Sequence, residues 1–138
     1  MNEKYMEEAL KLAKRAYDED EIPVGAVVVC NDKIIGCGYN QKEKLNNPLK
    51  HAELIAIEEA CNYIGDWRLN DCELYVTLEP CQMCMGAIVE TRIKKVVYGA
   101  SKSDQMFNIQ KDIIAESGIL EDDCLKIIQK FFKNKRNK

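Results

Sequence analysis

The hydrophobic pattern divides the first thirty residues into a helix and a strand. Between Asn2 and Glu19, apolar residues recur at helical spacing, with Glu, Lys and Arg residues between them. This spacing predicts an amphipathic first helix, which we expect Pro23 to end. From Val24 to Cys30 nearly every residue is apolar, and four are valines. That composition is typical of a central strand buried on both faces of a sheet.

A second strand is predicted immediately after the first. Asn31 and Asp32 supply a short turn, and the stretch from Lys33 to Tyr39 then favours a strand that returns as an antiparallel hairpin. This stretch contains Gly36 and Gly38, which indicate either a bulge or a close approach of another backbone near the end of the strand.

The rest of the chain alternates between helical and strand patterns. The predicted elements are a loop from Asn40 to Lys50, a helix from His51 to Ile64, a connector from Asp66 to Asp71, a strand from Glu73 to Leu78, a helix from Cys81 to Arg92, a strand from Lys95 to Gly99, a short edge strand at Ile113–Ala115 and a helix from Glu121 to Lys133. Such alternation implies parallel crossovers, whereas the short first turn allows only an antiparallel pair. We therefore expect an α/β fold with a mixed sheet and helices on both faces.

Length and composition indicate one globular domain. A chain of 138 residues is long enough to bury one core, and its 46% apolar and 31% charged residues are typical of a soluble protein. No apolar run approaches the length needed to cross a bilayer, and the first five residues are too polar for a signal peptide. We expect a single domain, residues 1–138, that is cytoplasmic and has no membrane partner.

The overall charge of the chain and the charge of its last residues differ in sign. The formal net charge of −3 provides no overall attraction to a nucleic acid. The last residues, Lys133–Lys138, nevertheless form a basic tail. This tail is interpreted either as a contact for phosphates or as a solvated chain end.

The seven cysteines fall into two groups. Their odd number, and the position of most of them alone inside apolar strands or helices, argue against a disulfide framework. Cys81 and Cys84 form a Cys-x-x-Cys pair. The other five are interpreted as small buried hydrophobic residues: Cys30, Cys37, Cys61, Cys72 and Cys124.

Cys81, Cys84 and the only histidine of the chain, His51, together supply three zinc ligands. On the first turn of a helix, a spacing of three residues places both sulfur atoms on one face. The unpaired N–H groups at the start of a helix favour the thiolate form, which binds metal. Closed structural zinc sites usually have four protein ligands, whereas catalytic sites have three and leave the fourth position to water. The count of three therefore favours a catalytic zinc.

Glu53 stands two residues after His51 and is the candidate proton carrier. Positions two apart do not face each other inside a helix, so the pair acts together only if His51 stands where the helix begins. Zinc lowers the pKa of a bound water from about 15.7 towards about 7. A carboxylate beside that water can carry its proton to a ring nitrogen and then to leaving ammonia. This combination predicts hydrolytic deamination of a purine or pyrimidine.

The same residues allow other interpretations. A lone Cys-x-x-Cys pair can be a redox pair or half of a structural zinc site, and a lone histidine is often a satisfied core residue. A zinc-stabilised binding module without turnover is another alternative, although a structural site has no use for the carboxylate of Glu53. His-x-Glu followed by Pro-Cys-x-x-Cys is a signature of zinc deaminases, and the unit as a whole favours deamination.

Six segments resemble those of a known family: Pro23–Val28, Gly38–Asn40, His51–Glu53, Leu74–Ile88, Arg92–Ile93 and Val96–Ala100. They are similar to bacterial tRNA-specific adenosine deaminases, which make inosine at the wobble position of the anticodon. The resemblance implies a three-layer α/β/α cytidine deaminase-like fold, with a mixed five-stranded sheet, and a homodimer. It implies that His51, Cys81 and Cys84 hold one Zn²⁺ per subunit. It also implies that Glu53 is the proton shuttle and that Asn40 hydrogen-bonds the flipped base.

One segment departs from that family. After Gly99 and Ala100 the family usually has an acidic residue and then a loop rich in glycine and alanine, whereas this chain continues with a shorter segment from Ser101 to Gln110. Because this region helps to hold the anticodon loop in the family, other substrates stay open, namely guanine, a free nucleoside or single-stranded DNA. We expect a nucleic acid, because a base is flipped out most easily from a single-stranded loop. The basic tail and Lys102 would then contact phosphates.

Overall fold

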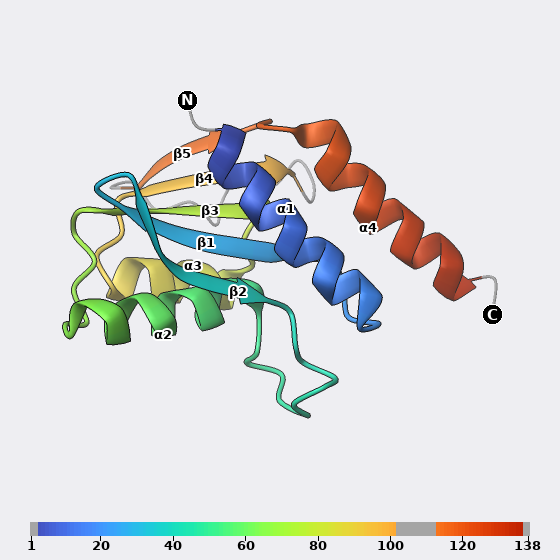
Figure 1. Cartoon of the computed structure of the whole chain (residues 1–138), viewed down its shortest axis with the longest axis horizontal. Coiled ribbons are helices and arrows are strands. Elements are labelled where there is room, and N and C mark those ends of the chain that lie inside the picture. Colours follow the sequence, from blue (N-terminus) through green and yellow to red (C-terminus); the bar gives the residue numbers. More distant parts are fainter. Residues whose placement is uncertain (1–2, 102–112, 137–138) are drawn as a thin grey trace.

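The computed structural model of the chain describes residues 3–101 and 113–136, which contain four helices and five strands (Figure 1). In chain order these are α1 (Glu3–Asp18), β1 (Gly25–Cys30), β2 (Lys33–Tyr39), α2 (Ala52–Ile64), β3 (Cys72–Leu78), α3 (Gln82–Glu90), β4 (Lys95–Ala100), β5 (Ile114–Ser117) and α4 (Glu121–Arg136). Each predicted helix and strand is present, with bounds that differ by a few residues. None of the described helices is both long and apolar enough to cross a membrane.

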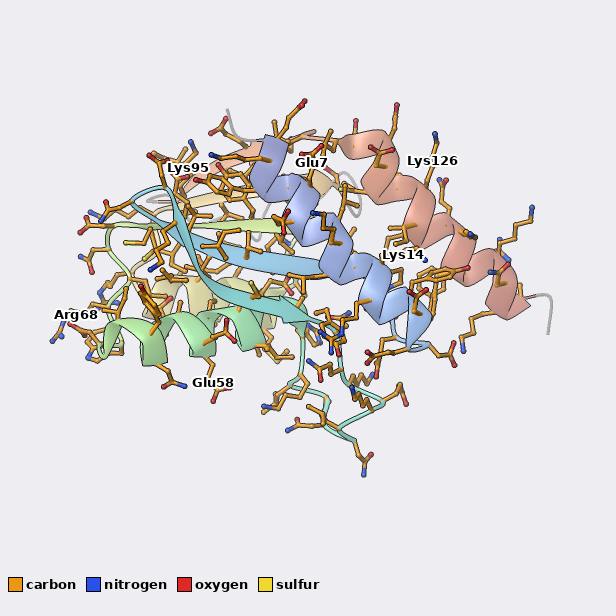
Figure 2. The ribbon with its side chains drawn as sticks, in the orientation of Figure 1. Glu7, Lys14, Glu58, Arg68, Lys95 and Lys126 are labelled. Carbon is orange, nitrogen blue, oxygen red and sulfur yellow. The ribbon has the colours of Figure 1, made fainter. Side chains whose placement is uncertain are left out.

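The five strands form one mixed sheet in the order β2-β1-β3-β4-β5. β1 pairs antiparallel with β2 and with β3, whereas β3, β4 and β5 are parallel to one another. Helices α1 and α4 lie side by side against one face, and α2 and α3 lie side by side against the other (Figure 1). The expected three-layer α/β/α arrangement is confirmed. Charged side chains such as Glu7, Lys14 and Lys126 project outward from α1 and α4 (Figure 2).

Buried apolar residues form a core on each face of the sheet. Along β1, Ala26 and Val28 pack in the core that includes α2 and α3, whereas Val27 and Val29 pack in the core that includes α1. The alternation follows from the period of two in a strand. The prediction that β1 is a central strand buried on both faces is confirmed.

Two glycines of β2 bring α2 unusually close to the sheet. A Cβ atom added at Gly36 would lie 2.2 Å from the carbonyl oxygen of Ala56, and one added at Gly38 would lie 2.3 Å from that of Ala52. The pairing of β1 with β2 also shifts between Val28 and Val29, which is a bulge. Both alternatives expected from these glycines therefore occur, and the close approach sets where α2 begins.

The end of α1 differs from the sequence-based expectation. The helix ends at Asp18 rather than at Pro23, because Asp20 adopts a left-handed conformation with φ of 63°. The N–H of Glu21 then donates to the carbonyl oxygen of Ala16 over 2.9 Å, which satisfies one of the last carbonyls of the helix. Pro23 lies in the extended segment that leads into β1.

All seven cysteines lie in the described residues, and none of them forms a disulfide there. The interpretation as buried hydrophobic residues holds for Cys72 and Cys124. It is wrong in degree for Cys30, Cys37 and Cys61, which are only half-buried. These three lie at the end of β1, on the edge strand β2 and near the end of α2, where the core covers them less completely.

Candidate metal centre and active site

His51 is the residue immediately before α2. Its backbone is extended, with φ of −79° and ψ of 150°, so its side chain does not follow the helical spacing of the residues after it. The side-chain oxygen Oδ1 of Asn40 accepts a hydrogen bond from the N–H of Ala52 over 2.8 Å, which satisfies a free N–H at the start of the helix. His51 therefore stands where α2 begins, as its pairing with Glu53 requires.

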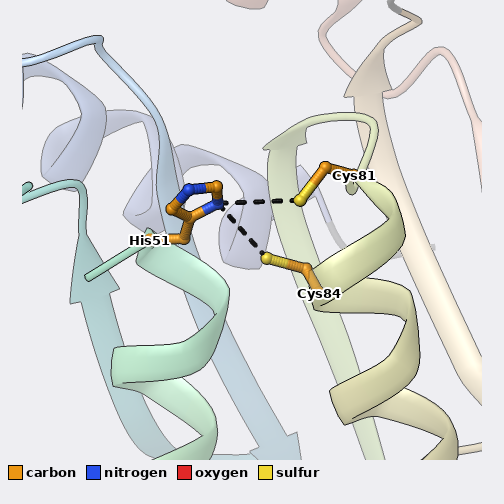
Figure 3. A group of neighbouring side chains, drawn as sticks. All are labelled: His51, Cys81 and Cys84. Carbon is orange, nitrogen blue, oxygen red and sulfur yellow. Dashed lines mark hydrogen bonds between the residues drawn. The ribbon is translucent and has the colours of Figure 1, made fainter. Parts of the chain in front are cut away.

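The two cysteines occupy the equivalent part of α3. Cys81 precedes the helix, with extended backbone angles φ −77° and ψ 174°, and Cys84 lies fully buried in its first turn. Nδ1 of His51 lies 3.7 Å from Sγ of Cys81 and 3.5 Å from Sγ of Cys84 (Figure 3). The starts of two helices thus bring one nitrogen and two sulfur donors together, all within 4.8 Å of one another.

This donor set fits a zinc ion. At ordinary zinc–ligand bond lengths, a tetrahedral ion separates a nitrogen and a sulfur ligand by roughly 3.6 Å. The separations between Nδ1 of His51 and the sulfurs of Cys81 and Cys84 are close to that value. One imidazole with two thiols is also a ligand combination of catalytic zinc sites, in which one coordination position is left to water.

The pKa of the Cys84 thiol is raised far above its ordinary value, most strongly by its hydrogen bond with Cys81, then by burial and by the negative charge of Glu53. We expected the start of α3 to favour the thiolate. At Cys84 the hydrogen bond with Cys81, burial and the charge of Glu53 outweigh that effect and favour the protonated thiol. A divalent cation counters them, because it favours the deprotonated sulfur. The site is therefore one in which metal binding and thiol deprotonation are coupled.

Glu53 lies beside the donors without being one of them. It is the second residue of α2, is only 4% exposed, and is close enough to Cys84 for its charge to raise the pKa of that thiol. Among the described residues, the cluster of candidate metal ligands contains His51, Cys81 and Cys84 but not Glu53. This position suits a proton carrier rather than a ligand.

A cavity of about 1100 Å³ opens onto these residues. Its walls come from the segment after α1, the loop before α2, the end of β3 and the inner side of α4. Asn40, His51, Glu53 and Cys81 all line it. Each expected site residue therefore lies at the cavity, except Cys84, which is buried and does not line it.

The hydrogen bond to Ala52 fixes the orientation of the Asn40 amide. A backbone N–H can only donate, so Oδ1 of Asn40 is its acceptor and is held towards the start of α2. The two N–H groups of Nδ2 are the part of this side chain that suits a ligand in the cavity. Asn40 therefore offers a hydrogen-bond donor at the cavity.

Several cavity residues were not found from the sequence. Glu21 and Glu79 are charged yet only 2% exposed, and both line the cavity. Each stands close before a proline within an apolar stretch, which is the signal that could have marked them. Phe131 and Phe132 of α4 also line the cavity, although that helix is far away along the sequence.

The basic tail is largely helical in the structure. Residues 133–136 belong to α4, and Lys135 forms an ion pair with Asp20, their Nζ and Oδ1 atoms lying 2.7 Å apart. This part of the tail is therefore helical with exposed side chains, and its roles as a phosphate contact or as a solvated chain end stay predictions. Residues 137–138 lie outside the described residues, as do Lys102 and the rest of the altered segment as far as Gln110.

Residues 1–100 match the family model described as the cytidine and deoxycytidylate deaminase zinc-binding region. The chain belongs to this deaminase family. The matched residues include His51, Glu53, Cys81 and Cys84. Members of the family are hydrolases, so the chain is a deaminase enzyme with a zinc-binding region, and its His51, Cys81 and Cys84 donor set suits that metal.

Within the deaminase family, the chain is similar to proteins with two kinds of substrate. It is 41% identical to the tRNA-specific adenosine deaminase of Bacillus subtilis, over 99% of this chain and 92% of that one. A structure from studies of A-to-I editing by tRNA:A34 deaminases is 36% identical, with a TM-score of 0.82 over 89% of this chain and 97% of that one. The guanine deaminase of Bacillus subtilis is 40% identical, with a TM-score of 0.71 over 75% of this chain and 67% of that one.

Proposed function

We propose that this deaminase converts adenosine to inosine at the wobble position of tRNA anticodons. The observation that carries the proposal is the extent of the match to tRNA adenosine deaminases. It covers 92% of the Bacillus subtilis protein and 97% of the solved tRNA:A34 deaminase structure. A likeness of this extent includes the cavity walls at both ends of the chain as well as the zinc ligands.

The residues of the chain divide the reaction between them. His51, Cys81 and Cys84 would hold Zn²⁺, which supplies Lewis-acid activation of a water molecule when bound. Glu53 takes a proton from the water, delivers one to the ring nitrogen beside the reacting carbon, and passes another to the departing amino group. The amino group leaves as ammonia, and the oxygen of the water remains on the base as the inosine carbonyl.

Asn40 and the cavity orient the base. The Nδ2 group of Asn40 can donate to an acceptor nitrogen of a purine, because the hydrogen bond from the N–H of Ala52 holds Oδ1 towards the start of α2. Phe131 and Phe132 line the same cavity, and an aromatic ring offers a stacking surface to a base removed from its strand. A flipped nucleotide is the substrate form that this arrangement accepts.

Deamination of guanine is the second candidate function. The 40% identity to a guanine deaminase favours it, and the same zinc ligands would serve both reactions. That match covers only 67% of the guanine deaminase, against 97% of the tRNA:A34 deaminase. We therefore rank guanine second.

We also propose a single deaminase domain over residues 1–138, one zinc ion per chain, a cytoplasmic location and a homodimer. The family resemblance supports the dimer, and the exposed apolar side chain of Met83 on α3 suits an interface between zinc-site helices. Elemental analysis gives the zinc content, and light scattering at micromolar concentration gives the oligomeric state. A metal-free active enzyme would contradict the proposed zinc content, and a monomer would contradict the proposed homodimer.

A parallel product assay tests the function. Purified protein is incubated with a tRNA that carries adenosine at the wobble position, with guanine, with adenosine, with cytidine and with single-stranded DNA. We expect inosine in the tRNA, and none with Glu53→Ala. Efficient deamination of guanine or cytidine, with no inosine in the tRNA, would refute the proposal.

A further inference from the structure

The loop formed by residues 41–50 joins two parts of the active site, because Asn40 precedes it and His51 follows it. Its backbone is closed on itself, since the N–H of Asn47 donates to the carbonyl oxygen of Lys42 over 2.9 Å. Residues 42–44 of this loop line the cavity. The loop is thus an ordered wall of the site.

The buried carboxylate of Glu21 is hydrogen-bonded to the backbone of this loop. Glu21 is only 2% exposed, and its Oε1 accepts the N–H of Glu43 over 3.0 Å while its Oε2 accepts the N–H of Lys44 over 2.7 Å. A buried charge is costly unless it is hydrogen-bonded, and bonds from N–H groups to an ionised acceptor are strong. Glu21 therefore fixes the backbone of the loop against the segment that follows α1.

Three lysines line the cavity, and two of them are neutralised within the chain. Nζ of Lys44 lies 3.1 Å from Oε1 of Glu19, and Nζ of Lys135 lies 2.7 Å from Oδ1 of Asp20. The third, Lys42, has no ion pair with any described residue. Six carboxylate side chains also line the cavity. Within the described part of the wall, Lys42 is the cation that an incoming anion can meet without breaking an ion pair.

We propose that Lys42 binds a phosphodiester group next to the base that is deaminated, and that Glu21 positions Lys42 by holding the loop. The inference rests on the proposed function, in which the substrate is a polynucleotide. An ammonium group on a fixed backbone makes a point contact with a phosphate and releases counterions. A free base carries no phosphate, so this contact favours RNA over guanine.

Binding of a tRNA anticodon stem-loop over a range of salt concentrations tests the role of Lys42. The inactive Glu53→Ala protein is used as the background, so that no product forms. We expect Lys42→Gln to weaken binding severalfold and to reduce the slope of log affinity against log salt by about 0.7, the value for one phosphate of a single strand. Lys42→Arg should restore both quantities, because it keeps the charge.

Two matched variants of the same loop serve as controls. Lys44→Gln removes a lysine that already pairs with Glu19, so it should change the salt slope much less. Glu43→Gln removes a negative charge beside Lys42. It should strengthen binding slightly, which is opposite to the effect of Lys42→Gln. Equal effects of Lys42→Gln and Lys44→Gln on binding and on the salt slope would indicate that only the overall charge of the loop matters, and would overturn the proposal.

Glu21→Gln tests the positioning role. Glutamine keeps the volume but has one acceptor oxygen, so one of the two N–H bonds from Glu43 and Lys44 is lost. We expect KM for the stem-loop to rise while kcat and zinc content stay near their original values. Lys42→Gln should have less effect in this background than alone, because the loop no longer presents the lysine.

The outcomes separate this inference from the proposed function. An enzyme that deaminates the stem-loop, but binds it equally well with Lys42→Gln, overturns the inference and leaves the function standing. An enzyme that neither binds nor deaminates the stem-loop overturns both. A Glu21→Gln protein with unchanged KM removes the positioning role of Glu21.

Discussion

Glu53 is buried beside the zinc ligands, and its proposed role depends on one proton-carrying carboxylate. Glu53→Gln keeps the size of the side chain but cannot take or give the proton. We expect the rate of inosine formation to fall by about 10²- to 10⁴-fold, with the zinc content unchanged. Elemental analysis and a product assay on the same preparation measure the two quantities.

Glu58 offers the matched control for this variant. It lies on the same helix with an exposed side chain that points outward (Figure 2). Glu58→Gln should leave both activity and zinc content unchanged. Loss of zinc in proportion to activity in Glu53→Gln would instead make Glu53 a ligand.

The environment of Cys84 predicts how zinc affinity depends on pH. Its pKa is raised by Cys81, burial and Glu53, so in the metal-free protein the thiol is protonated at ordinary pH. Zinc must displace that proton, so we expect affinity to increase as the pH rises over roughly pH 6 to 8. Competition with a chelator measures the affinity, and calorimetry in different buffers measures the protons released.

A cysteine outside the site provides the comparison. Cys84→Ala should abolish zinc binding and deamination, whereas Cys37→Ala, which alters a half-buried thiol on the edge strand β2, should change neither. Zinc affinity that stays constant over this pH range would contradict the coupling of metal binding to deprotonation.

At the level of elements, the contact between β2 and α2 sets the position of His51. A Cβ atom at Gly38 would lie 2.3 Å from the carbonyl oxygen of Ala52, the first residue of α2. Gly38→Ala therefore forces the start of the helix away from the sheet. We expect a loss of about 1–3 kcal/mol in the free energy of unfolding and weaker zinc binding, measured by denaturant titration and chelator competition.

Gly86 is the matching glycine without a close contact. It lies in α3, and a Cβ atom there would have no neighbour within 4 Å. Gly86→Ala should stabilise the protein by about 0.5–1 kcal/mol, because alanine loses less backbone entropy in a helix. If the two variants had equal effects, close packing would not be the role of Gly38.

Sequence patterns predict those elements whose causes are local. The turn at Asn31 and Asp32 is a two-residue hairpin turn because both residues adopt positive φ, 52° and 61°. The starts of α2 and α3, next to His51 and Cys81, were likewise predicted from the sequence. The valines of β1 act through the strand pattern itself, whereas the glycines of β2 indicated a close approach but not that α2 is the element that approaches.

The parts that could not be predicted depend on distant partners. Glu21 bonds to backbone groups 22 and 23 residues further along, and no local pattern marks that pairing. The raised pKa of Cys84 arises first from its hydrogen bond with nearby Cys81, and then from burial and from Glu53 on a different helix; the last two depend on the fold, and together these causes outweigh the local effect of the helix start. Asn40 was expected to contact a base from the family resemblance alone, whereas the hydrogen bond that its Oδ1 accepts from Ala52 is evident only in the fold.

At the scale of the whole molecule, the cavity is built from both ends of the chain. Residues 19–22 follow α1, whereas Phe131 and Phe132 belong to α4, the last helix. The segment that follows α1 is joined to α4 by the ion pair of Asp20 with Lys135. The cavity therefore forms only when the complete α/β/α arrangement is assembled, although the proposed zinc ligands lie in the middle of the sequence.

Phe132 is the residue of α4 that we expect to contact the substrate. Its side chain is 41% exposed at the cavity, whereas Phe131 is buried and packs against Tyr17. Stacking of a base on an aromatic ring contributes about 1–3 kcal/mol, or about 5- to 150-fold in affinity. Phe132→Ala should weaken stem-loop binding by that amount with little change in melting temperature, whereas Phe132→Tyr keeps a ring and should bind normally.

Tyr63→Ala removes an aromatic side chain of similar exposure that does not line the cavity, so it should leave binding unchanged. Equal binding by the Phe132→Ala protein and the original enzyme would show that α4 closes the cavity without contacting the nucleic acid.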